Sequence, residues 1–176
     1  MTGFARVTEN VLKHLDDKFE ICVLGHNWWG DPTPLQDRYK MFPSSNRYQT
    51  EPFGVQRIRE VVEREKPDIV FTINDIWIIN QQYQQIADLH EQKKFKFVGY
   101  APMDSYNWIG GLADTANKWD AVISYTEFGA HEFIAGGITQ PVAVIPHGMT
   151  PDQFYPMDKK EARKRLGLDP DIFIVF

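Results

Sequence analysis

The sequence predicts an α/β fold with a doubly wound, mostly parallel β-sheet. Short apolar segments alternate along the 176-residue chain with longer segments whose apolar residues recur every three or four positions. This alternation of predicted strands and helices is typical of doubly wound folds. The predicted strands are mostly continuously apolar, which indicates burial on both faces of the sheet and therefore parallel pairing.

The predicted strands share two properties. Each is too short to form a typical helix, and most are rich in β-branched or aromatic residues, which fit a pleated and buried surface. On this basis we expect strands at Phe19–Leu24, Ile69–Ile73, Lys96–Tyr100, Ala121–Ser124, Val142–Ile145 and Ile172–Phe176.

The predicted helices carry their apolar residues on one face. One helix, Lys159–Leu166, is also marked at both ends, because Asp158 and Glu161 form a capping box and Gly167 suits the position just after a helix. The other stripes with helical spacing run from Phe4 to Leu15, from Val55 to Val62, from Ile79 to His90 and from Leu112 to Trp119.

Three features depart from a regular alternation. The segment from Gly25 to Gly54 is rich in Pro, Ser and aromatic residues, and its length predicts a functional, partly packed loop. The chain opens with a predicted turn and helix, so we expect the first strand of such a sheet to be missing ahead of Thr2. The chain ends on a predicted strand, Ile172–Phe176. The sequence contains no further predicted strands or helices that would form a second domain with it.

Composition argues against several classes of protein. The net charge is −5, with both signs spread along the chain, which is unlike a nucleic-acid-binding surface. No segment stays apolar for the ~18 residues that a membrane-spanning helix needs, and no signal-peptide pattern is found. Cys22 is the single cysteine, which rules out a disulfide within the chain and favours a reducing, cytoplasmic location.

Polar residues follow five of the predicted strands. In open α/β sheets, ligands bind beyond the carboxyl ends of the strands. Any single residue there is more commonly a helix cap or a turn residue, but caps alone do not require His, Asp and Glu together. The set therefore predicts a binding site at this edge, formed by His26 and Asn27, Asn74 and Asp75, Asp104 and Tyr106, Thr126 and Glu127, and His147.

Two further motifs have a functional and a plain interpretation. Gly3 lies in a turn that opens a helix, where backbone N–H groups can approach a phosphate, although on the residues alone a plain turn is favoured. Asp169-Pro170-Asp171 has the D-x-D form of some metal-dependent transferases, but it precedes a strand and flanks a proline, so we predict a turn. The five histidines show no close pairing, and no metal is predicted.

The second half of the chain resembles a known family. The stretches Trp119–Gly129, Val144–Met149, Phe154–Pro156 and Ala162–Leu168 are similar to the middle of the large family of retaining GT-B glycosyltransferases, of the family 4 or group 1 type. The segment that opens at Gly3 also resembles the first glycine-containing loop of that family.

The resemblance implies a two-domain enzyme. Residues 1–150 would be an incomplete, Rossmann-like acceptor-binding domain, and residues 151–176 a linker helix and the first strand of a truncated donor-binding domain. The enzyme would transfer a sugar from a nucleotide-sugar donor with retained configuration and without a metal or other cofactor. The chain alone, lacking the C-terminal domain and its glutamates, is expected to be inactive.

The resemblance also suggests roles for single residues. Gly3 would place backbone N–H groups near the donor diphosphate. Asp104, where many relatives carry a histidine, would lie beside the transferred sugar as the catalytic residue. The expected acceptor-binding and sugar-binding residues are Arg6, Asp75, Tyr106, Glu127 and, at the hinge, His147.

One further departure from the family pattern and two alternative functions remain. Met149-Thr150-Pro151 replaces a segment that usually contains an aspartate, which puts that contact in doubt. A nucleotide-sugar epimerase of GT-B architecture, or a non-catalytic α/β module that binds a sugar or a protein partner, would fit the same pattern.

The segment Ile172–Phe176 is a candidate to fill the missing central strand position, either within the chain or by strand exchange in a homodimer.

Overall fold

The computed structural model describes residues 3–45, 51–106, 111–152 and 154–175. The chain forms two compact units, Met1–Pro146 and His147–Phe176.

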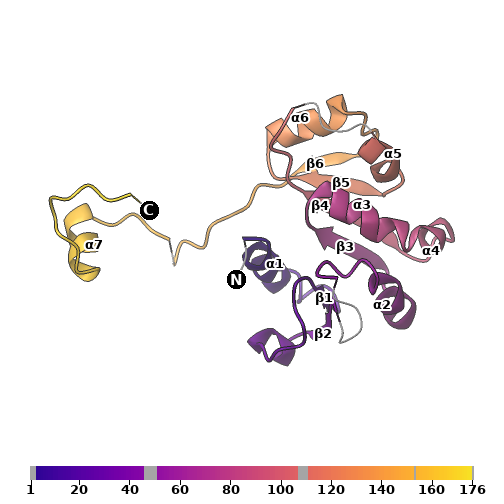
Figure 1. The fold of residues 1–176 in the computed structure, drawn as a ribbon, viewed down its shortest axis with the longest axis horizontal. Helices are drawn as coiled ribbons and strands as arrows, with labels where there is room; N and C mark the ends of the chain where they lie inside the picture. The colour runs from indigo at the N-terminus through magenta and orange to yellow at the C-terminus, as the bar shows by residue number, and fades with distance from the viewer. Residues whose placement is uncertain (1–2, 46–50, 107–110, 153, 176) are drawn as a thin grey trace. The chain divides into compact units, whose positions relative to one another are not determined.

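The first unit is built on a four-stranded parallel sheet (Figure 1). Its strands are ordered β3-β4-β5-β6, and every neighbouring pair is parallel. The predicted fold class, an α/β fold with a parallel sheet, is thereby confirmed. The strands are β3 (Ile69–Ile73), β4 (Lys96–Ala101), β5 (Ala121–Ser124) and β6 (Val142–Val144).

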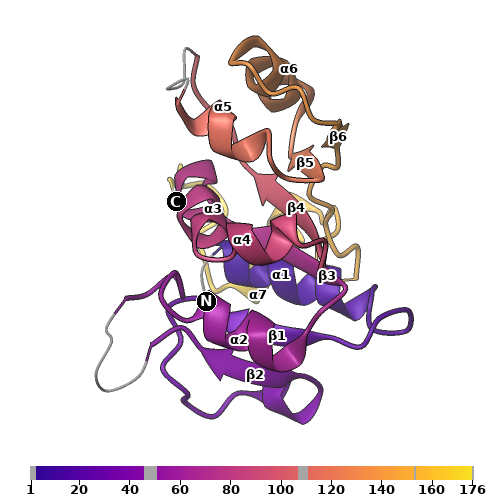
Figure 2. The same ribbon diagram turned by 90° about the vertical axis from the view of Figure 1, so that its right-hand side faces the viewer.

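Helices connect these strands, as the βαβ pattern requires. Around the sheet lie α2 (Ile58–Glu65), α3 (Ile76–Gln84), α4 (Ala87–Glu91), α5 (Gly111–Ala116) and α6 (Glu127–Ala135) (Figure 2).

The core lies between these helices and the four-stranded sheet. Ile79, Phe97, Val122 and Phe133 are fully buried within it. Gly99 on β4 lets the indole of Trp119 lie directly against the sheet, because a Cβ at this position would be 2.3 Å from Cζ3 of Trp119. The close packing of this side of the sheet therefore depends on a glycine at the centre of β4.

A second, two-stranded sheet corrects one prediction. Strand β1 (Cys22–Gly25) pairs in parallel with β2 (Lys40–Pro43), which lies inside the segment expected to be a loop. The same segment contains the 3₁₀ helix η1 (Pro34–Asp37), whose N-cap Thr33 accepts a hydrogen bond from the Leu35 backbone N–H. Only part of the predicted loop is therefore irregular, and residues 46–50 lie outside the described part of the chain.

The two sheets are not joined by strand pairing. Among the described residues, β1 pairs only with β2, and β3 pairs only with β4. Ile69 and Phe71 of β3 remain 45% and 36% exposed. Helix α1 (Gly3–Lys13), which precedes β1, has no buried residue although one face is apolar. The sheet is thus interrupted where the sequence predicted a missing strand.

The second unit contains helix α7 (Lys159–Arg165). As predicted, Asp158 caps this helix, accepting hydrogen bonds from the backbone N–H groups of Lys160 and Glu161 at 3.0 and 3.1 Å. Gly167 follows the helix with a φ of +66°, the conformation expected after a helix end.

The terminal strand prediction is wrong for the residues that the structure describes. Ile172–Val175 adopt no strand, and Phe173 and Val175 are 92% and 81% exposed. The physical reason is that a strand needs a hydrogen-bonded neighbour, and this unit contains none among its described residues. The preceding Asp169-Pro170-Asp171 forms the predicted turn, in which Asp169 accepts a hydrogen bond from the Asp171 N–H at 2.8 Å.

Candidate functional site

The candidate site lies at the carboxyl edge of the four-stranded sheet. Because β3, β4 and β5 are parallel and in register, with Ile73 opposite Tyr100 and Ala101 opposite Ser124, the residues that follow them emerge at the same edge. The sequence placed Asp75 after β3, Asp104 and Tyr106 after β4, and Thr126 and Glu127 after β5.

Asp75 is available for a role other than helix capping. It occupies the N-cap position of α3, yet its side chain makes no capping hydrogen bond. Burial, and then the charge of Asp104, raise the pKa of its carboxyl group. Asp75 therefore occupies the N-cap position of α3 without capping the helix through its side chain.

Asp104 lies in the loop that follows β4, and its charge acts on the Asp75 carboxyl group. Its side chain is exposed and makes no hydrogen bond with any described residue. Two carboxylates that affect each other electrostatically create a negatively charged centre. Such a centre can accept hydrogen bonds from hydroxyl groups of a ligand and can take up a proton.

Two tyrosines lie at the ends of β4 and β5, at the same edge of the sheet. The rings of Tyr100 on β4 and Tyr125 after β5 meet edge to face, with 4.5 Å between their centroids. Burial raises the pKa of both phenols, and the charge of Asp75 adds to the effect on Tyr125. Both side chains are therefore protonated at neutral pH, and Tyr100 donates a hydrogen bond to the carbonyl of Ile145.

The first turn of α6 lies at the carboxyl edge of the sheet, directly after β5. Thr126 is a helix cap, since its hydroxyl oxygen accepts a hydrogen bond from the Gly129 N–H at 3.0 Å. A Cβ on Gly129 would lie 2.5 Å from Oγ of Ser124 and 3.2 Å from Cβ of Met103. Glycine at this position therefore lets the helix approach both the end of β5 and the loop that carries Asp104.

An aromatic pair lies on the exposed side of this loop. Tyr106 and Phe128 meet edge to face at 5.0 Å and 89°, and they are 71% and 37% exposed. Glu127, in the first turn of α6, is also exposed. Exposed aromatic rings beside carboxylates are common in sites for ligands with both apolar and polar groups.

His26 links the end of β1 to the larger sheet. Its Nδ1 lies 3.0 Å from Nδ2 of Asn74, and its Nε2 lies 2.9 Å from Nε2 of Gln82. The same Gln82 nitrogen donates to the carbonyl of Phe53 at 2.7 Å. Burial lowers the pKa of His26 to about 4. His26 is thus a neutral ring held by amide side chains.

The remaining predicted residues are Gly3, Arg6 and His147. Gly3 begins α1, and a Cβ there would meet no atom within 4 Å, so its backbone is open to approach. Arg6 is exposed on the same helix. His147 is the first residue of the second unit, and burial lowers its pKa.

Sequence reasoning missed the aromatic residues Tyr100, Tyr125 and Phe128, although each is at or just beyond the end of a strand. Within the described parts of the chain, no three His, Cys, Asp or Glu side chains gather in a way that could hold a metal ion. Nor does any described helix have the length and apolar character needed to cross a membrane.

Fold and site together define an α/β domain that presents carboxylate and aromatic side chains at the carboxyl edge of a parallel sheet. A family model for Glycosyltransferase Family 4 matches residues 1–153, and the chain belongs to this family. No curated protein matches the sequence.

Proposed function

We propose that this chain is the acceptor-binding part of a retaining glycosyltransferase that uses a nucleotide-sugar donor. The observation that carries the proposal is the placement of Asp75 and Asp104 after the adjacent parallel strands β3 and β4, at the carboxyl edge of a domain from Glycosyltransferase Family 4. In this proposal the pair orients acceptor hydroxyl groups, and the exposed rings of Tyr106 and Phe128 pack against the apolar face of the acceptor.

Asp104 has the more direct part in this proposal. It is the exposed member of the pair and makes no hydrogen bond with a described residue, so its carboxylate is free to meet a ligand. It would interact with the transferred sugar or accept the proton of the attacking hydroxyl. Asp75, which is partly buried, would keep the local potential negative and hold the acceptor. Glu127 would contact the acceptor from the start of α6.

The donor would contact other elements. Backbone N–H groups at the start of α1, near Gly3, suit a diphosphate, because a helix N-terminus carries a partial positive charge. Arg6 on the same helix would contact the acceptor. His147 would be a sugar-binding residue at the hinge. The nucleotide itself would bind to a second domain, so the 176-residue chain alone would release no nucleotide from a nucleotide sugar.

The test is carried out in the natural full-length protein, with a panel of nucleotide sugars and acceptors and nucleotide release as the readout. Asp104→Asn should lower kcat about 100-fold or more, with a smaller effect on the acceptor KM, because loss of a positioned acid–base group costs about this much. Asp114→Asn, an exposed acidic position on α5, is the matched control. Near-normal turnover by a well-folded Asp104→Asn variant would refute the role.

A further inference from the structure

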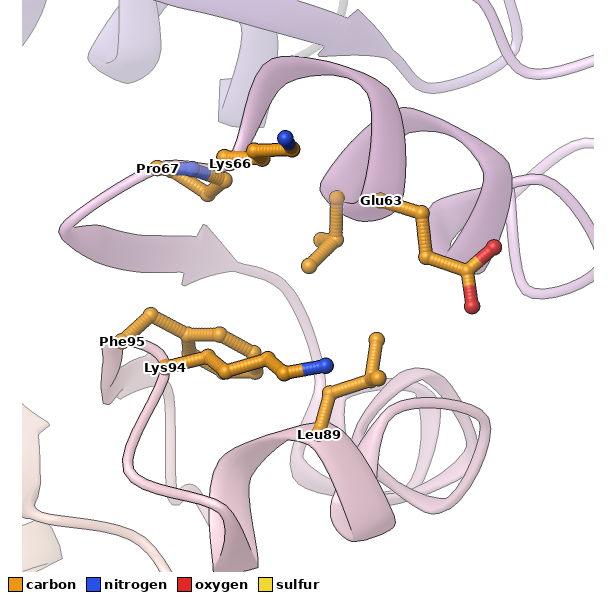
Figure 3. A pocket seen from close by; sticks show the side chains of 7 residues that line it. Glu63, Lys66, Pro67, Leu89, Lys94 and Phe95 are labelled. Carbon is orange, nitrogen blue, oxygen red and sulfur yellow. The ribbon is translucent and has the colours of Figure 1, made fainter.

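A cavity of about 480 Å³ lies at the other end of the sheet from the carboxylate pair. Pro67 and Phe95 line it, and they lie just before the first residues of β3 and β4, at the amino ends of these strands. Its volume is in the range of small-molecule sites. The full lining is Val62, Glu63, Lys66, Pro67, Leu89, Lys94 and Phe95 (Figure 3).

The inner wall of this cavity is apolar. Val62, Leu89 and Phe95 are each less than 10% exposed and belong to, or lie beside, the main hydrophobic core. The wall is therefore formed by side chains fixed in the packed interior. It offers an apolar ligand a surface that needs little rearrangement on binding.

The mouth of the cavity is positively charged. In Figure 3, Lys66 lies on one side of the hollow and Lys94 on the other, with Glu63 at the edge. Neither lysine forms an ion pair with any residue in the described ranges, whereas Arg59 neutralises Glu63 at 3.0 Å and also binds Asp88. Two unpaired ammonium groups thus flank an apolar wall.

The backbone holds one of these lysines at a position that suits glycine better. Lys66 ends α2 in the left-handed conformation, with φ 49° and ψ 56°. Side chains other than that of glycine are disfavoured there. A lysine at this position therefore carries a conformational cost, which is consistent with a use for its ammonium group at the mouth of the cavity.

We propose that this cavity binds a small amphipathic anion, namely a carboxylate attached to an aromatic or aliphatic body. The apolar body packs against Val62, Leu89 and Phe95, and the carboxylate lies between the ammonium groups of Lys66 and Lys94. The site lies at the opposite end of the sheet from the carboxyl edge and does not depend on the proposed transferase activity.

The probe is 4-phenylbutyrate, compared with the uncharged 4-phenylbutyramide, which has the same body. Binding to the 176-residue chain is measured by NMR titration. We expect the carboxylate to bind about 5-fold to 25-fold more tightly than the amide, because each of two exposed ion pairs contributes up to about 1 kcal/mol, or about fivefold. The largest chemical-shift changes on titration should be those of the backbone amides of Leu89, Lys94 and Phe95. Equal affinity of the two probes, or no binding, overturns the proposal.

Three variants separate binding from folding. Lys94→Gln should weaken carboxylate binding about fivefold at unchanged stability. Lys66→Gly should weaken binding to a similar degree while raising the Tm, because glycine suits the left-handed conformation. Lys18→Gln, at an exposed lysine that does not line the cavity, should leave affinity unchanged. If Lys66→Gly and Lys94→Gln retain wild-type affinity for the carboxylate, the proposal is wrong.

Discussion

At the scale of single residues, His26 shows how the two sheets are linked. The sequence placed it among the polar residues at the carboxyl edge, and the structure encloses its ring between Asn74 and Gln82. The ring is neutral, because burial lowers its pKa to about 4. The neutral ring of His26 therefore holds Asn74, which directly follows β3, in place.

The folded protein should lose stability as the pH falls from about 6.5 to about 4. In this range the unfolded chain takes up a proton at His26 that the folded chain does not. The free energy of unfolding should therefore fall by up to about 3 kcal/mol through this residue, given 1.36 kcal/mol per pKa unit. Above pH 6.5 the contribution is constant. Urea unfolding at a series of pH values between 7.5 and 4.5 measures this fall in the free energy of unfolding.

His26→Asn is the variant for this test, because it removes the titrating ring and keeps a hydrogen-bonding side chain. Its stability should vary less with pH over the same range than that of the natural protein. His131→Asn, which removes a ring that is 78% exposed, controls for the loss of a histidine. The same slope in the His26 variant and the natural protein would contradict the explanation.

The candidate site could be predicted from the sequence where polar residues directly follow strands. Asp75 and Asp104 are at the same edge of the sheet for that reason, since they follow the adjacent parallel strands β3 and β4. Thr126 turned out to be a cap, which sequence position alone does not distinguish from a ligand-binding residue. Phe128 was missed because its exposure depends on how closely α6 packs, and that packing depends on the space left by Gly129. Such contacts are tertiary and leave no periodic pattern.

At the scale of secondary structure, the strands of the larger sheet were predictable because each is apolar and ends in polar residues. Strand β2 (Lys40–Pro43) was missed, since its strand character comes from pairing with β1 and not from its composition. The stripe from Ile79 to His90 is divided between α3 and α4. Helix α6 was not predicted, because apolar residues occur on several of its faces and give little periodicity.

The two sheets should differ in local stability. Strand β4 pairs on both sides and contains the buried residues Phe97, Tyr100 and Ala101, whereas all four residues of β1 are partly exposed. Opening of β1 and β2 therefore exposes less apolar surface than opening of β4. We expect amides of β4 and β5 to exchange with solvent about 100-fold more slowly than those of β1 and β2.

Hydrogen exchange at pH 7, followed by NMR or mass spectrometry, measures this difference. A factor of 100 corresponds to about 2.7 kcal/mol between the two opening reactions. A control comes from the edge strand β6, which pairs only with β5 and should show intermediate protection. Equal protection of β1 and β4 would show that the two sheets unfold as one cooperative unit.

At the scale of the whole molecule, the interruption leaves one edge of β1 and one edge of β3 without a partner strand among the described residues. On β3, this edge carries exposed Ile69 and Phe71. Unpaired apolar edges favour association with another strand. In the second unit, the exposed segment Ile172–Val175 is apolar and forms no strand. One copy of the chain thus carries both an acceptor edge and a candidate donor segment.

We predict that the 176-residue chain forms a homodimer in which the segment 172–176 of one copy pairs with β1 and β3 of the other. Pairing within the chain is not observed for residues 172–175, so exchange between copies is the form that remains to be tested. Light scattering at 10 to 200 µM, roughly the range in which moderate interfaces form, should show a dimer that dissociates on dilution. Deletion of residues 169–176 should give a monomer at every concentration.

Phe71→Lys provides an independent test, because a charge on an edge strand opposes strand addition. This variant should also be monomeric while keeping its circular dichroism spectrum, since Phe71 is 36% exposed and lies on the edge strand of its sheet. Tyr155→Ser, which removes an exposed aromatic ring outside both segments, should leave the dimer intact. A dimer that survives both the deletion and Phe71→Lys must use another surface, and strand exchange would then be excluded as its basis.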